Sequence, residues 1–253
     1  MYVPYPVKRL YNFVKDYLAL RSIKRWSRFS SEDEFERAVK KRYFLFSREY
    51  AILPWGTSIV DYSEPDFDVP MWWDHFASIV REARPEESAV DLGPNQSYLL
   101  DALRDRGFKT LSVDYSPGVV VIQKMRGHES IYGNYVVDSL PKLLGERRAF
   151  DLITCKGAIN IDTIRDLAGF LRTLKESLAA GGLALVTPTN SEFSENGRYA
   201  FSLSNYIEKS RKIFLDAGFR EIVVEGLNTP KWKFPITLAY GDLERVSHWQ
   251  EFE

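Results

Sequence analysis

A short apolar run that ends in a glycine turn is the stretch of this sequence with the clearest chemical potential. The stretch is SAVDLGPNQS, residues 88–97, in which Asp91 lies within the apolar run and Gly93 follows its end. Such a run predicts a buried strand, and the turn after it can present backbone N–H groups and a helix N-terminus to a nucleotide. The residues therefore indicate a small-molecule site at the carboxyl end of this strand.

A second acidic residue, Asp114, closes the next apolar run, LSVDYS, about twenty residues past the turn. One carboxylate at the end of a strand can accept hydrogen bonds from both vicinal hydroxyls of a ribose. The same carboxylate would also suit a dinucleotide. However, Gly93, Asn95 and Ser97 do not form the pattern G-x-G-x-x-G, so a nicotinamide cofactor is less favoured.

The elements that must position these residues follow from the pattern of the chain after residue 88. Short apolar runs alternate with helical patterns, which is typical of a parallel sheet with crossover helices. Strands are predicted at 89–92, 110–114, around 132–137, 151–155, 183–187, 221–224 and 234–240. Helices are predicted at 98–106, 117–125, 162–180 and 204–217, and the last two are expected to stop at Gly181-Gly182 and at Gly218.

The first part of the chain, residues 1–70, is predicted to be a helical and loop extension of an α/β domain that spans residues 71–253. Its first helix is indicated by apolar positions at helical spacing, namely Leu10, Phe13, Val14, Tyr17 and Leu18. A second helix is expected after SSEDEF, residues 30–35, where an N-cap serine precedes acidic residues. An ordered loop is expected over 54–70, and a third helix over 71–84.

Five of these pieces, taken in order, resemble the class I S-adenosylmethionine-dependent methyltransferase family. The pieces are AVDLGPNQS, LSVDYS, YVVDSLP, FDLITC and LAAGGLALVTP, and the resemblance covers roughly residues 71–240. It implies a Rossmann-like α/β fold, with a mostly parallel doubly wound sheet and an antiparallel terminal strand. It also implies an enzyme that binds S-adenosyl-L-methionine and transfers its methyl group.

The resemblance further implies roles for individual residues. Asp91 and the Gly93 turn would bind the methionine part of the cofactor, and Asp114 would bind its ribose. For the adenine amine, Asp138 fits the spacing and Asn134 is the competing alignment, while Asp138 can instead cap a short helix. The cofactor-binding candidates are Asp91, Gly93, Asn95, Ser97, Asp114, Tyr115, Asp138, Ser139 and Cys155.

The glycine-rich motif is degenerate, because Asn95 and Ser97 stand where the family carries its second and third glycines. Asparagine is the non-glycine residue that best tolerates a left-handed backbone, so the turn can keep its shape. Ser97 can cap the following helix. The departure concerns the affinity for the cofactor more than the fold.

The methyl acceptor is not identified by any motif, and a small or planar acceptor is expected. An aromatic cluster that can stack such a molecule precedes the first strand, namely Trp55, Tyr62, Phe67, Trp72 and Trp73, although core packing explains it equally well. His75 lies beside this cluster and is the only candidate base. Lys156 follows the fourth strand, where metal-dependent members place an acid, so no metal is expected.

Charge and composition bound the remaining possibilities. The net charge is −1, but basic residues crowd the first fifty positions, which suggests either a solvated helical face or a nucleic-acid contact. The alternative function is accordingly a non-catalytic methyltransferase-like scaffold whose basic helices bind nucleic acid or a protein partner. A single cysteine, Cys155, excludes an internal disulfide. No apolar run is long enough to cross a bilayer, so we expect a cytoplasmic protein with no membrane partner, of undetermined oligomeric state.

Overall fold

The computed structural model describes the greater part of the chain. The described residues are 5–31, 34–35, 37–38, 50–53, 57–60, 77–94, 98–136, 138–145, 149–160, 166–189, 212–223, 236–247 and 250–251. None of the helices within these residues is both long and apolar enough to cross a membrane.

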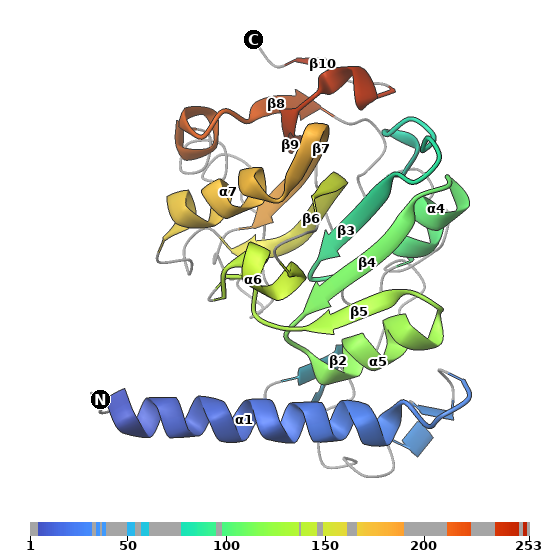
Figure 1. Ribbon diagram of the computed structural model, residues 1–253, viewed down its shortest axis with the longest axis vertical. Helices are drawn as coiled ribbons and strands as arrows, with labels where there is room; N and C mark the ends of the chain where they lie inside the picture. Colours follow the sequence, from blue (N-terminus) through green and yellow to red (C-terminus); the bar gives the residue numbers. More distant parts are fainter. Residues whose placement is uncertain are drawn as a thin grey trace, which may run out of the picture.

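An eight-stranded sheet forms the centre of the molecule, in the order β10-β8-β9-β7-β6-β3-β4-β5 (Figure 1). Its strands are β3 (Ser88–Leu92), β4 (Lys109–Asp114), β5 (Glu129–Tyr132), β6 (Phe150–Asn160), β7 (Leu178–Thr189), β8 (Arg220–Val223), β9 (Ile236–Gly241) and β10 (Gln250–Glu251). Strands β3 to β7 pair in parallel, and β9 runs antiparallel to both β7 and β8. The predicted mostly parallel sheet with an antiparallel strand near its C-terminal end is confirmed.

The crossover helices described in the domain are α4 (Leu99–Asp105), α5 (Pro117–Met125), α6 (Leu140–Leu144) and α7 (Leu167–Glu176). Two of them, α5 and α7, begin with a side-chain cap. At the start of α5, the Ser116 hydroxyl accepts a hydrogen bond from the Val119 N–H at 3.3 Å, and Pro117 occupies the first turn. At the start of α7, the Asp166 carboxylate accepts one from the Gly169 N–H at 2.8 Å. These side chains satisfy N–H groups that a helix leaves without intrahelical partners.

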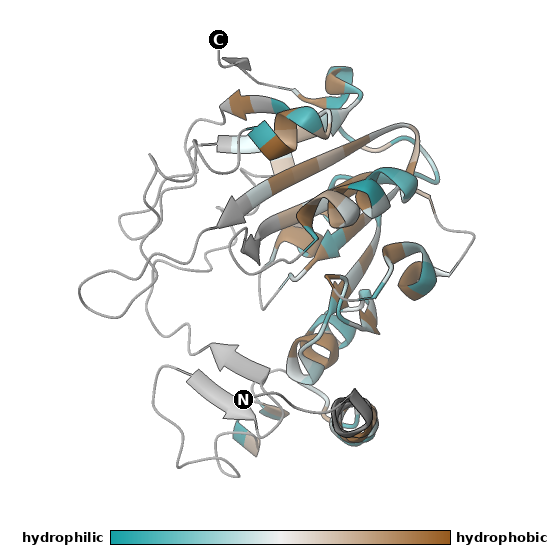
Figure 2. Ribbon diagram, turned by 90° about the vertical axis from the view of Figure 1, so that its left-hand side faces the viewer, coloured by the Kyte–Doolittle hydropathy of each residue, from teal (hydrophilic) through white to brown (hydrophobic). Residues whose placement is uncertain are grey.

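Both faces of the sheet are buried, so its strands carry continuous apolar runs. Side chains alternate between two cores: Ile153 and Ala184 belong to the core that contains α6 and α7, whereas Leu152 and Leu183 belong to the core that contains α4. Figure 2 shows these strands as a mostly hydrophobic layer between the helices. The two cores fix the sheet in register and therefore fix where its strands end.

Several predicted boundaries in the domain are wrong, since β6 and β7 also extend beyond the predicted 151–155 and 183–187. The third strand lies at Glu129–Tyr132 instead of around 132–137, because the chain turns at Gly133, whose N–H donates to the Asp114 carbonyl at 3.0 Å. The helix predicted to run to Ala180 and stop at the glycine pair ends at Glu176. The glycines lie inside β7, where a Cβ on Gly182 would be 2.9 Å from the Phe150 carbonyl oxygen.

The segment in front of the sheet also differs from its prediction. A helix was expected over 71–84, but among its described residues only Ala77 and Ser78 are helical. Val80 instead forms an antiparallel bridge with Val246, and the Arg81 N–H donates to the Arg245 carbonyl at 2.9 Å. Pairing with the C-terminal segment therefore replaces helical hydrogen bonds here.

The N-terminal extension contains one long helix, α1 (Tyr5–Trp26), and a short helical segment within 34–38. The predicted cap is confirmed, since the Ser31 hydroxyl accepts from the Glu34 N–H at 3.3 Å. Ile23, Trp26 and Phe35 are buried together against α5. The expected loop over 54–70 is wrong in its described part. Residues 57–60 form strand β2 (Thr57–Val60), which pairs antiparallel with β1 (Tyr50–Leu53). Strand β2 is rich in β-branched residues, which favour strands. The predicted domain boundary at residue 70 lies outside the described residues.

Candidate functional site

The fold creates a natural ligand position where the strand order reverses. Strand β3 lies between β4 and β6, so the chain proceeds from β3 toward one edge of the sheet and later returns to its other side (Figure 1). In open parallel sheets, ligands bind beyond the carboxyl ends of the strands at such a point. The residues at the carboxyl ends of β3, β4 and β6 therefore define the candidate site.

Asp91 and Gly93 occupy the carboxyl end of β3. The Asp91 side chain is buried, and its Oδ1 accepts a hydrogen bond from the Thr154 hydroxyl of β6 at 2.9 Å. Gly93 has φ of 71°, a left-handed conformation that favours glycine, and its N–H donates to the Val113 carbonyl at 2.9 Å. The turn after β3 is thus tied to the end of β4.

Asp114 lies at the carboxyl end of β4, next to that turn. Its carboxylate is buried, and its Oδ1 accepts a hydrogen bond from the Ser116 N–H at 2.7 Å. Ser116 in turn caps α5, so the position of the carboxylate is fixed by both the strand and the helix. Tyr115, the next predicted site residue, has 47% of its surface exposed. The structure thus places two buried carboxylates at the ends of adjacent parallel strands.

Tyr135 belongs to the surroundings of this site, although no role was predicted for it. It lies in the turn after β5, is buried, and packs its ring 6.1 Å from that of Phe170. Burial raises the pKa of its phenol well above the usual range, and the charges of Asp114 and Asp91 add to this effect. The phenol is therefore a neutral group near both carboxylates. A tyrosine shortly after a strand end is the signal that could have identified this residue. It was missed because the predicted strand, around 132–137, included Tyr135.

Cys155 is fully buried in β6, and its thiol donates to the Leu92 carbonyl at 3.4 Å. Burial raises the pKa of this thiol well above its usual range, and the charge of Asp91 raises it further. The thiol is therefore protonated at neutral pH and is a poor nucleophile. Its position, behind the turn at the end of β3, makes Cys155 part of the wall that supports the site.

Asp138 and Asn134 form one turn between β5 and α6. The Asp138 Oδ2 accepts from the Asn134 N–H at 3.3 Å, and the Asp138 N–H donates to the Asn134 carbonyl at 2.7 Å. Both residues are partly exposed. Ser139 precedes the first turn of α6 but makes no side-chain capping bond. The two competing alignments for the adenine contact therefore lie at the same place in the fold.

The remaining predicted residues lie outside the part of the chain that the structure describes. They are Asn95 and Ser97 of the turn, the candidate base His75, and the aromatic residues Trp55, Tyr62, Phe67, Trp72 and Trp73. Within the described ranges, no group of three histidine, cysteine or acidic side chains is arranged to hold a metal ion.

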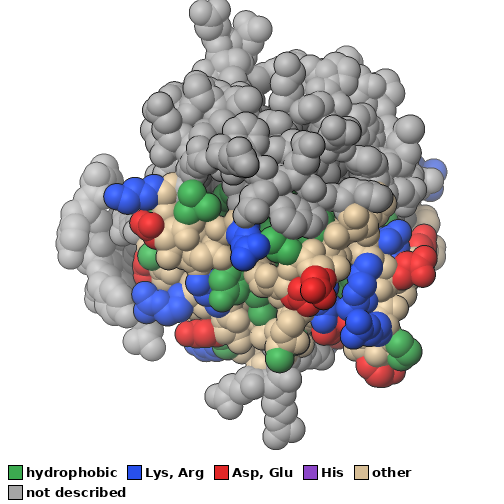
Figure 3. All heavy atoms as spheres, turned by 90° about the horizontal axis from the view of Figure 1, so that it is seen from above, with side chains coloured by type: hydrophobic (Ala, Val, Ile, Leu, Met, Phe, Trp, Pro, Cys, Tyr) green, Lys and Arg blue, Asp and Glu red, His purple; other side chains and the backbone are tan. Residues whose placement is uncertain are grey.

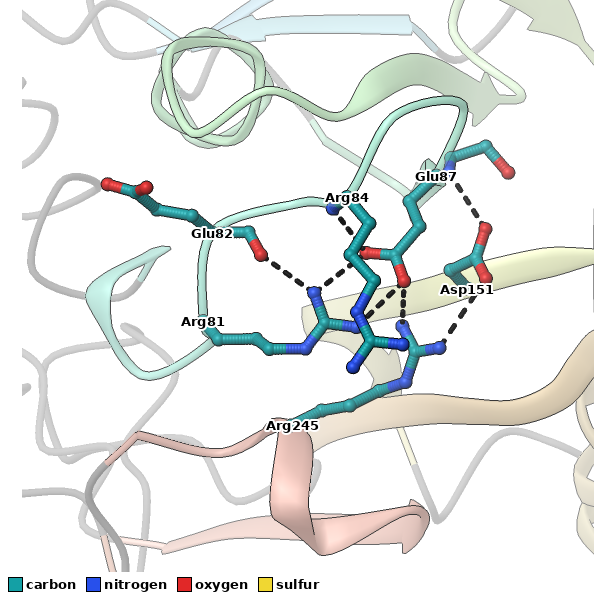
Figure 4. Close-up of polar contacts among 7 residues, drawn as sticks. Arg81, Glu82, Arg84, Glu87, Asp151 and Arg245 are labelled. Atoms are coloured by element: carbon teal, nitrogen blue, oxygen red, sulfur yellow. Dashed lines mark hydrogen bonds and ion pairs between the residues drawn. The ribbon is translucent and has the colours of Figure 1, made fainter.

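A separate ion cluster lies at the opposite, amino-terminal ends of β3 and β6 (Figure 4). Glu87 accepts two hydrogen bonds from the Arg81 guanidinium, at 2.7 and 2.9 Å, and lies 3.2 Å from that of Arg245. Arg245 also lies 3.6 Å from Asp151, whose carboxylate accepts from the Ser88 N–H at 3.0 Å. The hydrogen bonds from Arg81 lower the pKa of Glu87 to about 2. This cluster joins the segment before β3 and the segment after β9 to the two central strands β3 and β6.

The chain is similar to known proteins in sequence and in fold. A family model described as a methyltransferase domain matches residues 72–220. An S-adenosylmethionine-dependent methyltransferase from Clostridium acetobutylicum is similar in structure, with a TM-score of 0.50 and 14% identity, over 70% of this chain and 93% of that one. The protein DesVI from Streptomyces venezuelae has a TM-score of 0.49 and 13% identity, over 68% of this chain and 91% of its own. A search of curated proteins gives no match.

Proposed function

The chain belongs to the class I S-adenosylmethionine-dependent methyltransferase family, and we propose that its cofactor is held at the carboxyl ends of β3 and β4 while a small or planar acceptor receives the methyl group. The prediction of a methyl-transferring enzyme is confirmed at the level of the family. The placement of the cofactor and the class of acceptor are the parts proposed here.

The observation that carries the placement is the pair of buried carboxylates, Asp91 and Asp114, on adjacent strands. S-adenosylmethionine supplies an electrophilic methyl group on a sulfonium and carries an amino group, a carboxylate and a ribose with two hydroxyls. Asp114 would accept from the ribose hydroxyls, and Asp91 would attract the amino group. The Gly93 turn, which lies before α4, would offer backbone N–H groups to the carboxylate.

The charge of this edge also distinguishes between cofactors. Two carboxylates in a poorly solvated position favour a positively charged ligand and disfavour the negatively charged pyrophosphate of a dinucleotide. The cationic sulfonium and amino group therefore suit the site better than a nicotinamide cofactor does. The missing G-x-G-x-x-G pattern indicates the same preference.

For the adenine end, we assign the turn of Asn134 and Asp138. The structure brings both side chains to one turn after β5, which is adjacent to β4 in the sheet. Either a carboxylate or an amide oxygen can accept a hydrogen bond from the exocyclic amine of adenine. Tyr115 follows Asp114 directly and is partly exposed. Its ring is the aromatic surface nearest in sequence to the carboxylate proposed to bind the ribose.

The acceptor class is inferred from the sequence alone. The aromatic residues between Trp55 and Trp73 lead toward β3, and an aromatic enclosure suits a small or planar molecule. Methyl transfer depends mainly on in-line alignment, so the chain's task is to orient the acceptor and exclude water. His75 is the residue we propose to accept a proton if the acceptor requires it.

The proposal is tested by methyl transfer from isotopically labelled S-adenosylmethionine to a cell extract separated into small-molecule, nucleic-acid and protein fractions. We expect the label in the small-molecule fraction, with its incorporation strongly reduced by Asp114→Asn. The matched control is Asp216→Asn, because Asp216 is exposed and distant in sequence from the site. If the label enters RNA or protein instead of small molecules, the proposed acceptor class is wrong. The proposed cofactor site would not be contradicted by that result.

A further inference from the structure

Helix α1 carries an exposed apolar stripe that the proposed function does not use. The stripe consists of residues at helical spacing, each between 39% and 69% exposed, namely Leu10, Phe13, Val14, Tyr17 and Leu18. Leu20 extends the stripe and is 56% exposed. Clusters of this kind on a soluble protein mark a surface that meets another apolar phase or partner.

The stripe does not point toward the domain. Farther along α1, Ile23 and Trp26 are buried against α5. Counted at about 100° per residue, these two positions lie about 160° around the helix from the centre of the stripe. The helix therefore attaches to the domain by one face at its C-terminal end and presents the opposite face elsewhere. Figures 1 and 2 show α1 lying outside α5 and β5, beside the domain.

The charge of α1 indicates what it meets. The helix has six basic residues and one acidic residue, a net charge of +5, within a chain whose net charge is −1. Arg21, Lys24 and Arg25 are exposed at its C-terminal end, and Arg28 follows them. On the face seen in Figure 3, by contrast, basic and acidic side chains of the described residues are interspersed. The charge of α1 is therefore local and attracts an anionic surface.

We propose that α1 binds reversibly to an anionic lipid surface, with the stripe from Leu10 to Leu20 inserted among the lipids and its basic residues at the headgroups. A helix with an apolar, partly aromatic face and several basic residues is the form in which proteins lie in a membrane interface without crossing it. Basic side chains add attraction to anionic headgroups, and salt weakens it. The sequence-based expectation of no membrane partner rested on the lack of a spanning segment, which a helix lying in the interface does not need.

A second copy of the chain suits this surface less well. Pairing through α1 would bring two helices of charge +5 together. Nucleic acid also fits poorly, because it would leave the aliphatic residues Leu10, Val14 and Leu18 uncovered.

The test is vesicle flotation with the full chain, using vesicles of phosphatidylcholine alone and vesicles that also contain phosphatidylglycerol. We expect binding to the anionic vesicles only, weakened by raising the salt concentration. The double variant L10S/F13S should reduce the partition coefficient at least about tenfold. The matched control is I213S/L215S, which removes two apolar residues that are 42% and 41% exposed on another helix, and it should bind as the wild type does.

Circular dichroism and binding of S-adenosylhomocysteine establish that the variants are folded, since the stripe is exposed and distant from the core. Three results would overturn the proposal: equal binding to neutral and anionic vesicles, an unchanged partition coefficient for L10S/F13S, or a solution dimer that L10S/F13S dissociates while vesicles remain unbound. Binding of a short RNA that is lost in L10S/F13S, without vesicle binding, would also overturn it in favour of nucleic acid.

Discussion

Replacing Glu87 by glutamine removes the negative charge at the centre of the ion cluster that holds the two ends of the domain together. Glu87 accepts from Arg81 through both carboxylate oxygens and lies 3.2 Å from Arg245 (Figure 4). Glutamine has nearly the same shape but only one acceptor oxygen and no charge. The variant therefore leaves two guanidinium groups, which are 26% and 12% exposed, without their shared carboxylate.

The expected loss of stability follows from the pKa of Glu87, which its surroundings lower from 4.5 to about 2. One pKa unit corresponds to about 1.4 kcal/mol, so the interactions of the carboxylate contribute at most about 3 kcal/mol. Because Arg81 is partly exposed, we expect about 2 kcal/mol at pH 7. Because the folded-state pKa is depressed, this contribution is present above about pH 4.5 and is lost as the pH falls toward 2.

Denaturant unfolding at pH 7 and at pH 3 measures this difference, and a fall in melting temperature of about 4–8 °C should accompany it at pH 7. The matched control is Glu86→Gln. Glu86 is 81% exposed, and its ion pair with Lys109 is also exposed. This control should change stability by less than about 0.5 kcal/mol. Equal effects of the two variants, or an effect of Glu87→Gln that stays the same at pH 3, would show that the Glu87 carboxylate does not stabilise the fold through its charge.

Three further predictions concern the cofactor site. Asp114→Ala should weaken binding of S-adenosylhomocysteine by about 1.5–3 kcal/mol through lost charge-assisted hydrogen bonds, and an unchanged affinity by calorimetry would show that β4 does not hold the ribose. Asn95→Gly should bind the cofactor product as well as the wild type or better, whereas Asn95→Val should lose about 1–3 kcal/mol; equal affinities would mean that Asn95 has an ordinary backbone. The Cys155 thiol, buried and with a raised pKa, should react with a thiol reagent only at the rate of unfolding, and rapid labelling of the native protein would contradict its placement.

The sequence predicted the part of the site that depends on strand ends. Asp91, Gly93 and Asp114 follow apolar runs that are buried on both faces, and such runs end where a glycine or a charged residue stops the pattern. The register of the sheet then brings these residues together, because parallel neighbours end at the same edge. The sequence placed each carboxylate at a strand end, and the structure shows that these two strands are neighbours.

The sequence was less informative where apolar residues pack without forming the expected element. Tyr135 is buried although it lies in a turn. Because it is an apolar residue, the predicted third strand ran past Gly133, whereas the strand ends just before this glycine. The pattern of Leu178 to Ala180 continued a helical period, although these residues form the start of β7 before a left-handed Gly181. The spacing of apolar residues in a sequence shows that one face of an element is apolar, but it does not show what covers that face. The stripe of α1 shows the same limit, since its spacing equals that of a buried helix.

Calorimetric titration of the full chain with S-adenosylhomocysteine shows whether the carboxyl ends of β3 and β4 hold S-adenosylmethionine. We expect saturable binding at one site per chain, an affinity reduced at least about tenfold by Asp114→Asn, and no such reduction by Asp216→Asn. NADH should give no saturable binding in the same experiment. Undetectable binding of S-adenosylhomocysteine at millimolar concentration, or an affinity that Asp114→Asn leaves unchanged, would show that the cofactor is not held there.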